Sequence, residues 1–152
     1  MSKFEKIIFL DEENTMLGPY AEAVMKRLLA YAGMNRLKVS SKGTVVLFPE
    51  PVNQKIALIA EKKGIFLAYH RASGIKASDF SEKTLVLTMD EETKNRVYHK
   101  FTEASNVFTL KNYVEQTGSL HAPVGGSVED FEAVCRELEA LLNSLLEKEI
   151  GS

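Results

Sequence analysis

The residues with the clearest chemical potential form an acidic run directly after the first apolar segment of the chain. Asp11, Glu12 and Glu13 follow the apolar run 6–10, and Pro19 suits the first turn of a helix that begins shortly afterwards. A turn from a buried strand into a helix directs backbone N–H groups at one point and so forms an anion site. These three carboxylates carry more negative charge than the roughly half positive charge of a helix N-terminus can offset. The sequence therefore predicts a loop that repels a phosphate dianion unless these side chains point away.

The Asp11 side chain leaves two alternatives open. In the first, its carboxylate folds into the N–H groups of its own loop and takes the place of an anion. In the second, Asp11, Glu12 and Glu13 are solvated loop acids with a capping role. Neither alternative hydrolyses phosphate.

The other candidate nucleophile and metal ligands are few. Cys135 is the single cysteine, which excludes an internal disulfide and a cysteine metal cluster. It falls on the apolar stripe of the last expected helix, so we expect a buried structural thiol. His70, His99 and His121 are far apart in the sequence and match no zinc spacing. His121 can in principle donate a proton, but a lone loop histidine is usually solvated. We expect no cofactor and no metal.

Strand and helix patterns alternate along the chain. Short apolar runs predict strands at 6–10, 37–41, 84–88 and 106–108. Periodicity and caps predict helices at 19–32, 51–64, 90–102 and from Ser127 onwards, with a short helix near Ser78 in an otherwise irregular segment 65–83. This order is typical of an α/β protein, in which a parallel sheet carries helices on both faces.

The composition is that of an ordinary soluble globular protein, with 45% hydrophobic and 26% charged residues. A net charge of −2 gives no electrostatic footprint for nucleic acid. No apolar run reaches the roughly 18 residues of a membrane span, and the N-terminal residues lack the pattern of a signal peptide. We expect a cytoplasmic protein that binds neither nucleic acid nor membrane.

The acidic loop resembles the phosphate-binding loop of the low-molecular-weight protein tyrosine phosphatases. That loop reads Cys-x-Gly-Asn-x-Cys-Arg-Ser-Pro, or has one residue more, and it aligns here on Asn14, Pro19, Ala21 and Glu22. The similarity continues in residues 39–43 and 85–90, which resemble the family's second and third strands. Residues 107–114 and 123–127 resemble its protein-arginine phosphatase branch. The resemblance implies one domain over residues 1–150, with three layers and a four-stranded parallel sheet in the order 2-1-3-4.

The positions that carry the family's chemistry differ in this chain. Asp11 stands in the place of the nucleophilic Cys, Leu17 in that of the phosphate-binding Arg, and Ala122 in that of the general-acid Asp. The loop also has Glu13 for Gly, Met16 for the second Cys and Gly18 for Ser. A leucine cannot make the bidentate hydrogen bonds of an arginine to phosphate. The resemblance further implies that Ser41 and His70 support the loop through Asn14.

The resulting hypothesis is a pseudophosphatase, a catalytically inactive member of this family that acts as a binding or regulatory module. Its partner would be an unidentified protein or a basic peptide held by the acidic cleft, and it would be a monomer or a weak dimer. The expected binding residues are Asp11, Glu12, Glu13, Asn14, Thr15, Met16, Leu17 and Gly18.

Two enzymatic alternatives remain. One is phosphatase activity of the low-molecular-weight tyrosine or arginine type. The other is a magnesium-dependent phosphohydrolase with Asp11 as nucleophile, because residues 7–17 faintly resemble the Asp-x-Asp-x-Thr motif of haloacid-dehalogenase-type phosphatases. Glu13 is one methylene longer than the general-acid Asp of that motif, and no matching later Lys or acidic pair is evident.

Overall fold

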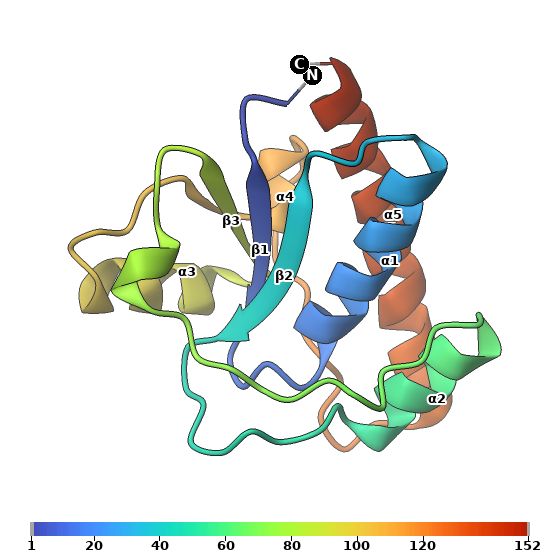
Figure 1. The fold of residues 1–152 in the computed structure, drawn as a ribbon. Helices are drawn as coiled ribbons and strands as arrows, with labels where there is room; N and C mark the ends of the chain where they lie inside the picture. The colour runs from blue at the N-terminus through green and yellow to red at the C-terminus, as the bar shows by residue number, and fades with distance from the viewer. Residues whose placement is uncertain (1, 152) are drawn as a thin grey trace.

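A computed structural model describes residues 2–151 and shows four parallel strands in one sheet (Figure 1). They are β1 (Lys6–Asp11), β2 (Lys38–Gly43), β3 (Thr84–Thr88) and β4 (Val107–Thr109). Their order is β2-β1-β3-β4, which confirms the predicted α/β fold and sheet order. Because β1 is a central strand, Asp11 leaves the sheet between the carboxyl ends of its neighbours, where ligands of such folds bind.

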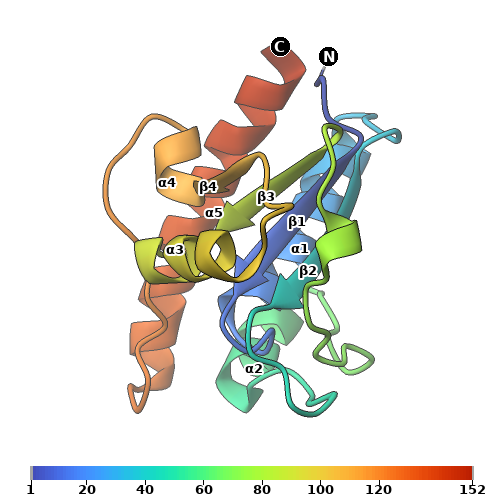
Figure 2. The ribbon, with the colours of Figure 1, turned by 90° about the vertical axis from the view of Figure 1, so that its left-hand side faces the viewer.

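Helices cover both faces of this sheet. They are α1 (Leu17–Tyr31), α2 (Gln54–Lys62), α3 (Glu91–Lys100), α4 (Leu110–Tyr113) and α5 (Val128–Gly151), with a short 3₁₀ turn at Ala77–Asp79. Figures 1 and 2 show α1 and α5 side by side on one face and α3 on the other. The three layers are those predicted. No helix within residues 2–151 combines the length and apolar character that crossing a bilayer requires.

The core divides according to the alternation of side chains along β1. Ile7 and Phe9 are fully buried in the larger cluster, with α1, α2 and α5. Ile8 and Leu10 are fully buried in the smaller cluster on the α3 face. A strand buried on both faces reads as a continuous apolar run, so residues 7–10 hold β1 rigidly and fix the direction in which Asp11 leaves it.

Two of the boundaries that differ from prediction lie beside the loop. β2 continues to Gly43 instead of ending at Ser41. A Cβ on Gly43 would lie 2.9 Å from the backbone N of Asn14 and 2.9 Å from the carbonyl O of Glu12, so only glycine allows the strand to approach the loop this closely. α2 begins at Gln54 because the Asn53 side chain accepts hydrogen bonds from the next helical N–H groups.

Other limits shift by one or two residues at both strands and helices. α1 begins at Leu17, so its first turn includes Pro19 but starts before it. The four-residue helix α4 was not predicted; the Thr109 side chain caps it by accepting from Asn112 N at 3.1 Å. Other predicted caps are confirmed, since Asp90 Oδ1 accepts from Thr93 N at 2.7 Å and Ser127 Oγ accepts from Asp130 N at 3.2 Å.

Candidate functional site

The Asp11 carboxylate fills the loop that connects β1 to α1. Its Oδ1 atom accepts a hydrogen bond from Asn14 N at 2.5 Å. Its Oδ2 atom accepts from Gly18 N at 3.0 Å and from Met16 N at 3.3 Å. The N–H groups therefore converge on an anion that belongs to the chain itself, which is the first of the two alternatives open from the sequence.

Burial and the backbone N–H groups of the loop act in opposite directions on the pKa of Asp11. Burial raises the pKa of its carboxyl above the ordinary value of 3.8, and the N–H groups of Gly18, Asn14 and Met16 oppose this rise. Gly18 also makes room for the carboxylate, since a Cβ there would lie 3.1 Å from Asp11 Oδ2. The glycine at position 18 and the aspartate at position 11 thus fit one another.

Asn14 holds the loop in shape from behind. Its backbone has a φ of 61°, a left-handed conformation that asparagine tolerates better than most residues, and it is fully buried. Its Nδ2 atom donates to Ser41 Oγ at 3.0 Å, and its carbonyl O lies 2.7 Å from His70 Nε2. Asn14 Oδ1 accepts from Ser73 N at 2.9 Å. The hydrogen bonds to Ser41 and His70 are those expected, whereas Ser73 was missed because the irregular segment that carries it has no sequence signal for this contact.

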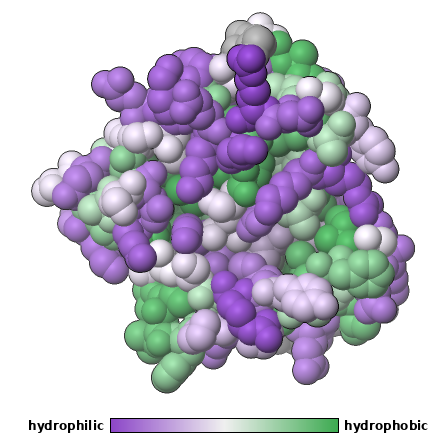
Figure 3. Space-filling model, viewed as in Figure 1, coloured by the Kyte–Doolittle hydropathy of each residue, from purple (hydrophilic) through white to green (hydrophobic). Residues whose placement is uncertain are grey.

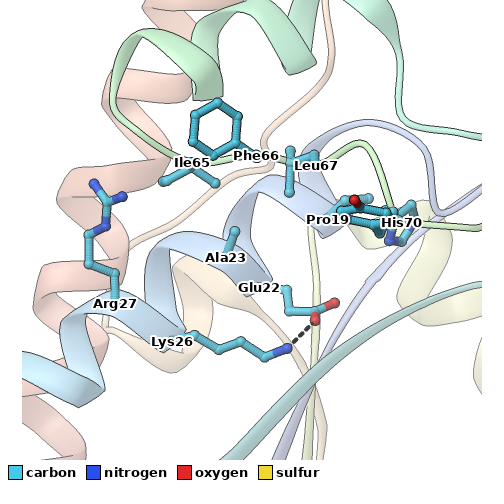
Figure 4. Close-up of a pocket in the computed structure, with 10 residues that line it drawn as sticks. Pro19, Glu22, Ala23, Lys26, Arg27, Ile65, Phe66, Leu67 and His70 are labelled. Carbon is cyan, nitrogen blue, oxygen red and sulfur yellow. Dashed lines mark hydrogen bonds and ion pairs between the residues drawn. The ribbon is translucent and has the colours of Figure 1, made fainter.

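The supporting network continues into α1. Ser41 Oγ donates to Glu22 Oε1 at 2.7 Å, and Glu22 Oε2 pairs with Lys26 Nζ at 2.6 Å. Figure 4 shows this ion pair at the edge of a cavity of about 460 Å³ between α1 and residues 65–70, with His70 on its border. This cavity lies behind the loop and its lining does not include Asp11.

A second cavity, of about 470 Å³, opens on the Asp11 side of the loop. Its lining combines acidic and other polar side chains with apolar ones: Asp11, Glu12, Glu13, Thr15, Met16, Leu17, Met89, Asp90, Leu120, His121, Ala122 and Val124. Of the predicted binding residues, Asn14 and Gly18 do not line it. Leu17 is only 2% exposed, because its side chain also packs into the core beneath the loop. We call this cavity the loop pocket.

The two glutamates of the acidic run remain in solvent. Glu12 and Glu13 are exposed, and Glu12 Oε2 lies 3.6 Å from Arg96 NH1. The three acids therefore have different surroundings, with Asp11 inside the loop and the glutamates at the rim of the loop pocket. The side chains of Val45, Leu47 and Phe48 are also exposed, and Figure 3 shows an apolar patch at the lower left of this face of the molecule.

The groups of a cysteine phosphatase do not meet at this site. Cys135 lies in α5 and is 1% exposed, and burial raises the pKa of its thiol to about 12. Leu17 and Ala122 line the loop pocket but carry neither a charge nor a transferable proton. The described residues therefore place no thiol in this loop, and its N–H groups donate to Asp11 instead.

One group at the rim was not predicted from the sequence. His121 Nε2 lies 3.9 Å from Asp90 Oδ2 and 3.6 Å from Glu92 Oε2. The donor atoms of these side chains all lie within 4.8 Å of one another. The predicted elements placed His121 in a late loop and Asp90 at a helix cap, and nothing in their spacing showed that the fold would bring them together.

Comparison with known proteins gives a consistent result. Residues 6–151 match the family described as low molecular weight phosphotyrosine protein phosphatase. A protein-arginine-phosphatase from Geobacillus stearothermophilus is 32% identical over 145 residues, which cover 94% of this chain and 95% of the relative. A crystal structure of a low molecular weight protein tyrosine phosphatase from T. tengcongensis has a TM-score of 0.88 at 26% identity, covering 94% of this chain and 98% of the other. The YwlE arginine phosphatase of G. stearothermophilus has a TM-score of 0.85 at 30% identity, covering 95% and 92%.

Proposed function

The chain belongs to the low-molecular-weight phosphotyrosine protein phosphatase family, and from this premise we propose that it is a non-catalytic binding module, whose loop pocket receives a basic side chain of a partner protein or peptide. The observation that carries the proposal is the position of the Asp11 carboxylate, which accepts the hydrogen bonds of the phosphate-binding loop. A phosphate group would have to displace this carboxylate and would meet Glu12 and Glu13 beside it.

The lining of the loop pocket supports a cation with an aliphatic stem. Met16, Met89 and Leu120 offer apolar walls, and Glu12 and Glu13 stand at the rim. Long basic side chains bury their methylene groups along such walls and keep the charged end near polar groups. Arginine fits best, because its planar guanidinium makes paired hydrogen bonds to carboxylates.

Two further observations favour arginine over other cations. The guanidinium of Arg96 already lies against Glu12 at 3.6 Å, so the rim attracts this group within the chain itself. Among the relatives, the similar protein from G. stearothermophilus is a protein-arginine-phosphatase. A pocket shaped for phosphoarginine, in which Asp11 fills the place of the phosphate group, would accept an arginine side chain that carries no phosphate.

Binding of an arginine-rich peptide tests the proposal. We expect Glu12→Gln/Glu13→Gln to weaken binding at least about fivefold in isothermal titration calorimetry, because two rim charges near the ligand are each worth about 0.5 kcal/mol or more. These substitutions leave Asp11 and its hydrogen bonds in place. Glu61→Gln/Glu147→Gln changes the net charge equally at exposed positions of α2 and α5 and should bind like the wild type.

A second peptide separates attraction between charges from contacts that depend on shape alone. In this peptide each arginine is replaced by citrulline, which has the same shape without the charge, and we expect its binding to be lost. Equal affinity of the wild type and Glu12→Gln/Glu13→Gln for the arginine peptide, or equal affinity for both peptides, contradicts the proposal.

The catalytic alternatives are tested by turnover. Asp11 is a poor nucleophile in this structure, because both of its oxygens accept hydrogen bonds from the loop. We therefore expect no hydrolysis of phosphotyrosine, phosphoarginine or an aryl phosphate, with or without magnesium. Turnover that disappears in Asp11→Asn would establish the enzyme instead.

A further inference from the structure

We propose that Asp90, Glu92 and His121 form a metal site beside the loop pocket, which Asp90 and His121 line, and that it binds a divalent transition-metal ion, with Zn²⁺ as the best match. One imidazole and two carboxylates are ligands that zinc accepts, and three protein ligands with an open position are typical of its reactive sites. The proposal is independent of the proposed function, since Glu12 and Glu13 take no part in it.

The distances between the ligand atoms are close to those around a bound ion. At metal–ligand bonds of about 2.0–2.2 Å, two ligands of a tetrahedral ion lie about 3.4 Å apart. His121 Nε2 is 3.6 Å from Glu92 Oε2 and 3.9 Å from Asp90 Oδ2. The side chains of His121 and Glu92 are 61% and 70% exposed, so small rotations bring them to an ion without moving the backbone.

Asp90 is the fixed member of the group. Its Oδ1 atom caps α3 by accepting from Thr93 N at 2.7 Å, and this bond holds the carboxylate so that Oδ2 faces His121. Its side chain is 22% exposed. One ligand is therefore pre-positioned by the fold, while Glu92 from the first turn of α3 and His121 from the loop before α5 close on it from two other segments.

The local charge favours a cation. Within residues 2–151, Asp90 and Glu92 form no ion pair with a lysine or arginine, and His121 is the one basic side chain against them. Their neighbour Glu91, by contrast, lies 3.8 Å from Lys94 Nζ. The N-terminus of α3 offers about half a positive charge, which is less than two carboxylates carry. A divalent ion supplies the rest.

An ion at this place would have an open position toward the loop pocket. Asp90 and His121 line that pocket, together with Leu120 and Ala122 on the same side. The open position would take water or an oxygen atom of an anionic ligand, because such donors suit zinc. The ion would neutralise the charge of Asp90 and Glu92, while Glu12 and Glu13 keep their negative charges in the lining of the loop pocket.

Zinc titration of the protein without a histidine tag tests the site. We expect one Zn²⁺ per chain by isothermal titration calorimetry, and a Co²⁺ derivative with the visible absorption of a low-coordinate ion. His121→Ala and Asp90→Asn should each weaken Zn²⁺ binding by more than about tenfold, since even residues that only orient ligands have effects of that size. Asn keeps the helix cap at position 90, so loss of binding there reports the ligand and not the fold.

Matched controls lie on the same helix. His99→Ala removes a histidine from the last turn of α3, and Glu91→Gln removes the neighbouring acid; both should bind Zn²⁺ like the wild type. Absence of Zn²⁺ binding in the wild type overturns the proposal. So does binding that survives in His121→Ala or that His99→Ala abolishes. The arginine-peptide experiment in metal-free buffer is unaffected by any of these outcomes.

Discussion

Removal of the Asp11 carboxylate should convert the loop into a phosphate-binding site. In Asp11→Ala, the N–H groups of Asn14, Met16 and Gly18 lose their acceptor, while the network behind Asn14 keeps them in position. Each lost bond to a charged acceptor is worth about 1.5–3 kcal/mol, but burial already opposes the charge of Asp11 and water can reach the opened loop. We therefore expect a net loss of about 1–3 kcal/mol, which lowers Tm by roughly 2–12 °C in a chain of this size.

Inorganic phosphate should restore part of the stability that Asp11→Ala loses. Leu17 provides no guanidinium and the glutamates repel the ligand, so a dissociation constant of about 5 mM is a reasonable expectation. At about 50 mM phosphate, mass action then adds about 1.4 kcal/mol of stability, or about 3–6 °C in Tm. The wild type should gain less than about 1 °C, because its own carboxylate fills the loop.

Thermal unfolding in phosphate and in sodium chloride of equal ionic strength measures the effect. Asp79→Ala is the matched control, because Asp79 Oδ2 also accepts a backbone hydrogen bond, from Lys76 N at 2.7 Å, but far from the loop. Its response to phosphate should equal that of the wild type. If Asp11→Ala gains no more from phosphate than Asp79→Ala does, the N–H groups do not form an anion site and the reasoning fails.

Two further predictions concern the same carboxylate. Gly18→Ala should lower the free energy of unfolding, measured in urea, by about 1–3 kcal/mol, because its Cβ would lie 3.1 Å from Asp11 Oδ2. This loss is expected even though alanine normally favours a helix. In the Asp11→Ala background the loss should vanish, and additive effects of the two substitutions would refute the crowding of these side chains. The pKa of Asp11 is raised above 3.8 in the native state, so protonation of this carboxyl adds stability that is fully present below pH 3.8 and is lost as pH rises through the native pKa. The free energy of unfolding of the wild type should therefore fall with rising pH relative to the non-titrating Asp11→Asn, and a difference independent of pH would contradict this.

The parts of the fold that the sequence predicted are those with a strong local signal. β1 and β3 are short apolar runs typical of buried strands, and α5 carries a broad apolar stripe from Phe131 to Leu145. α4 escaped because a four-residue helix is too short to show a period. The limits of β2 and α2 depended on Gly43 and Asn53, whose roles appear only when the loop packs against them.

Some contacts of the site could be predicted from the sequence and others could not. The alignment of the loop placed Asn14, Ser41 and His70 together, and the structure joins them by hydrogen bonds. It could not decide where the Asp11 carboxylate points, because that depends on a side-chain rotation and on backbone N–H directions set by the loop as a whole. Ser73 depends on the course of an irregular segment, which no periodic pattern encodes.

The self-filled loop also limits where a partner can bind. The N–H groups of the loop are held by a buried asparagine, and buried donors without an acceptor destabilise a protein. In this chain the Asp11 carboxylate accepts the hydrogen bonds of Asn14 N, Met16 N and Gly18 N. The order of the loop therefore no longer depends on a ligand, and a ligand gains little by entering it. The proposed recognition therefore uses the rim of the loop pocket, where Glu12 and Glu13 remain in solvent and where charge can be matched without displacing the carboxylate.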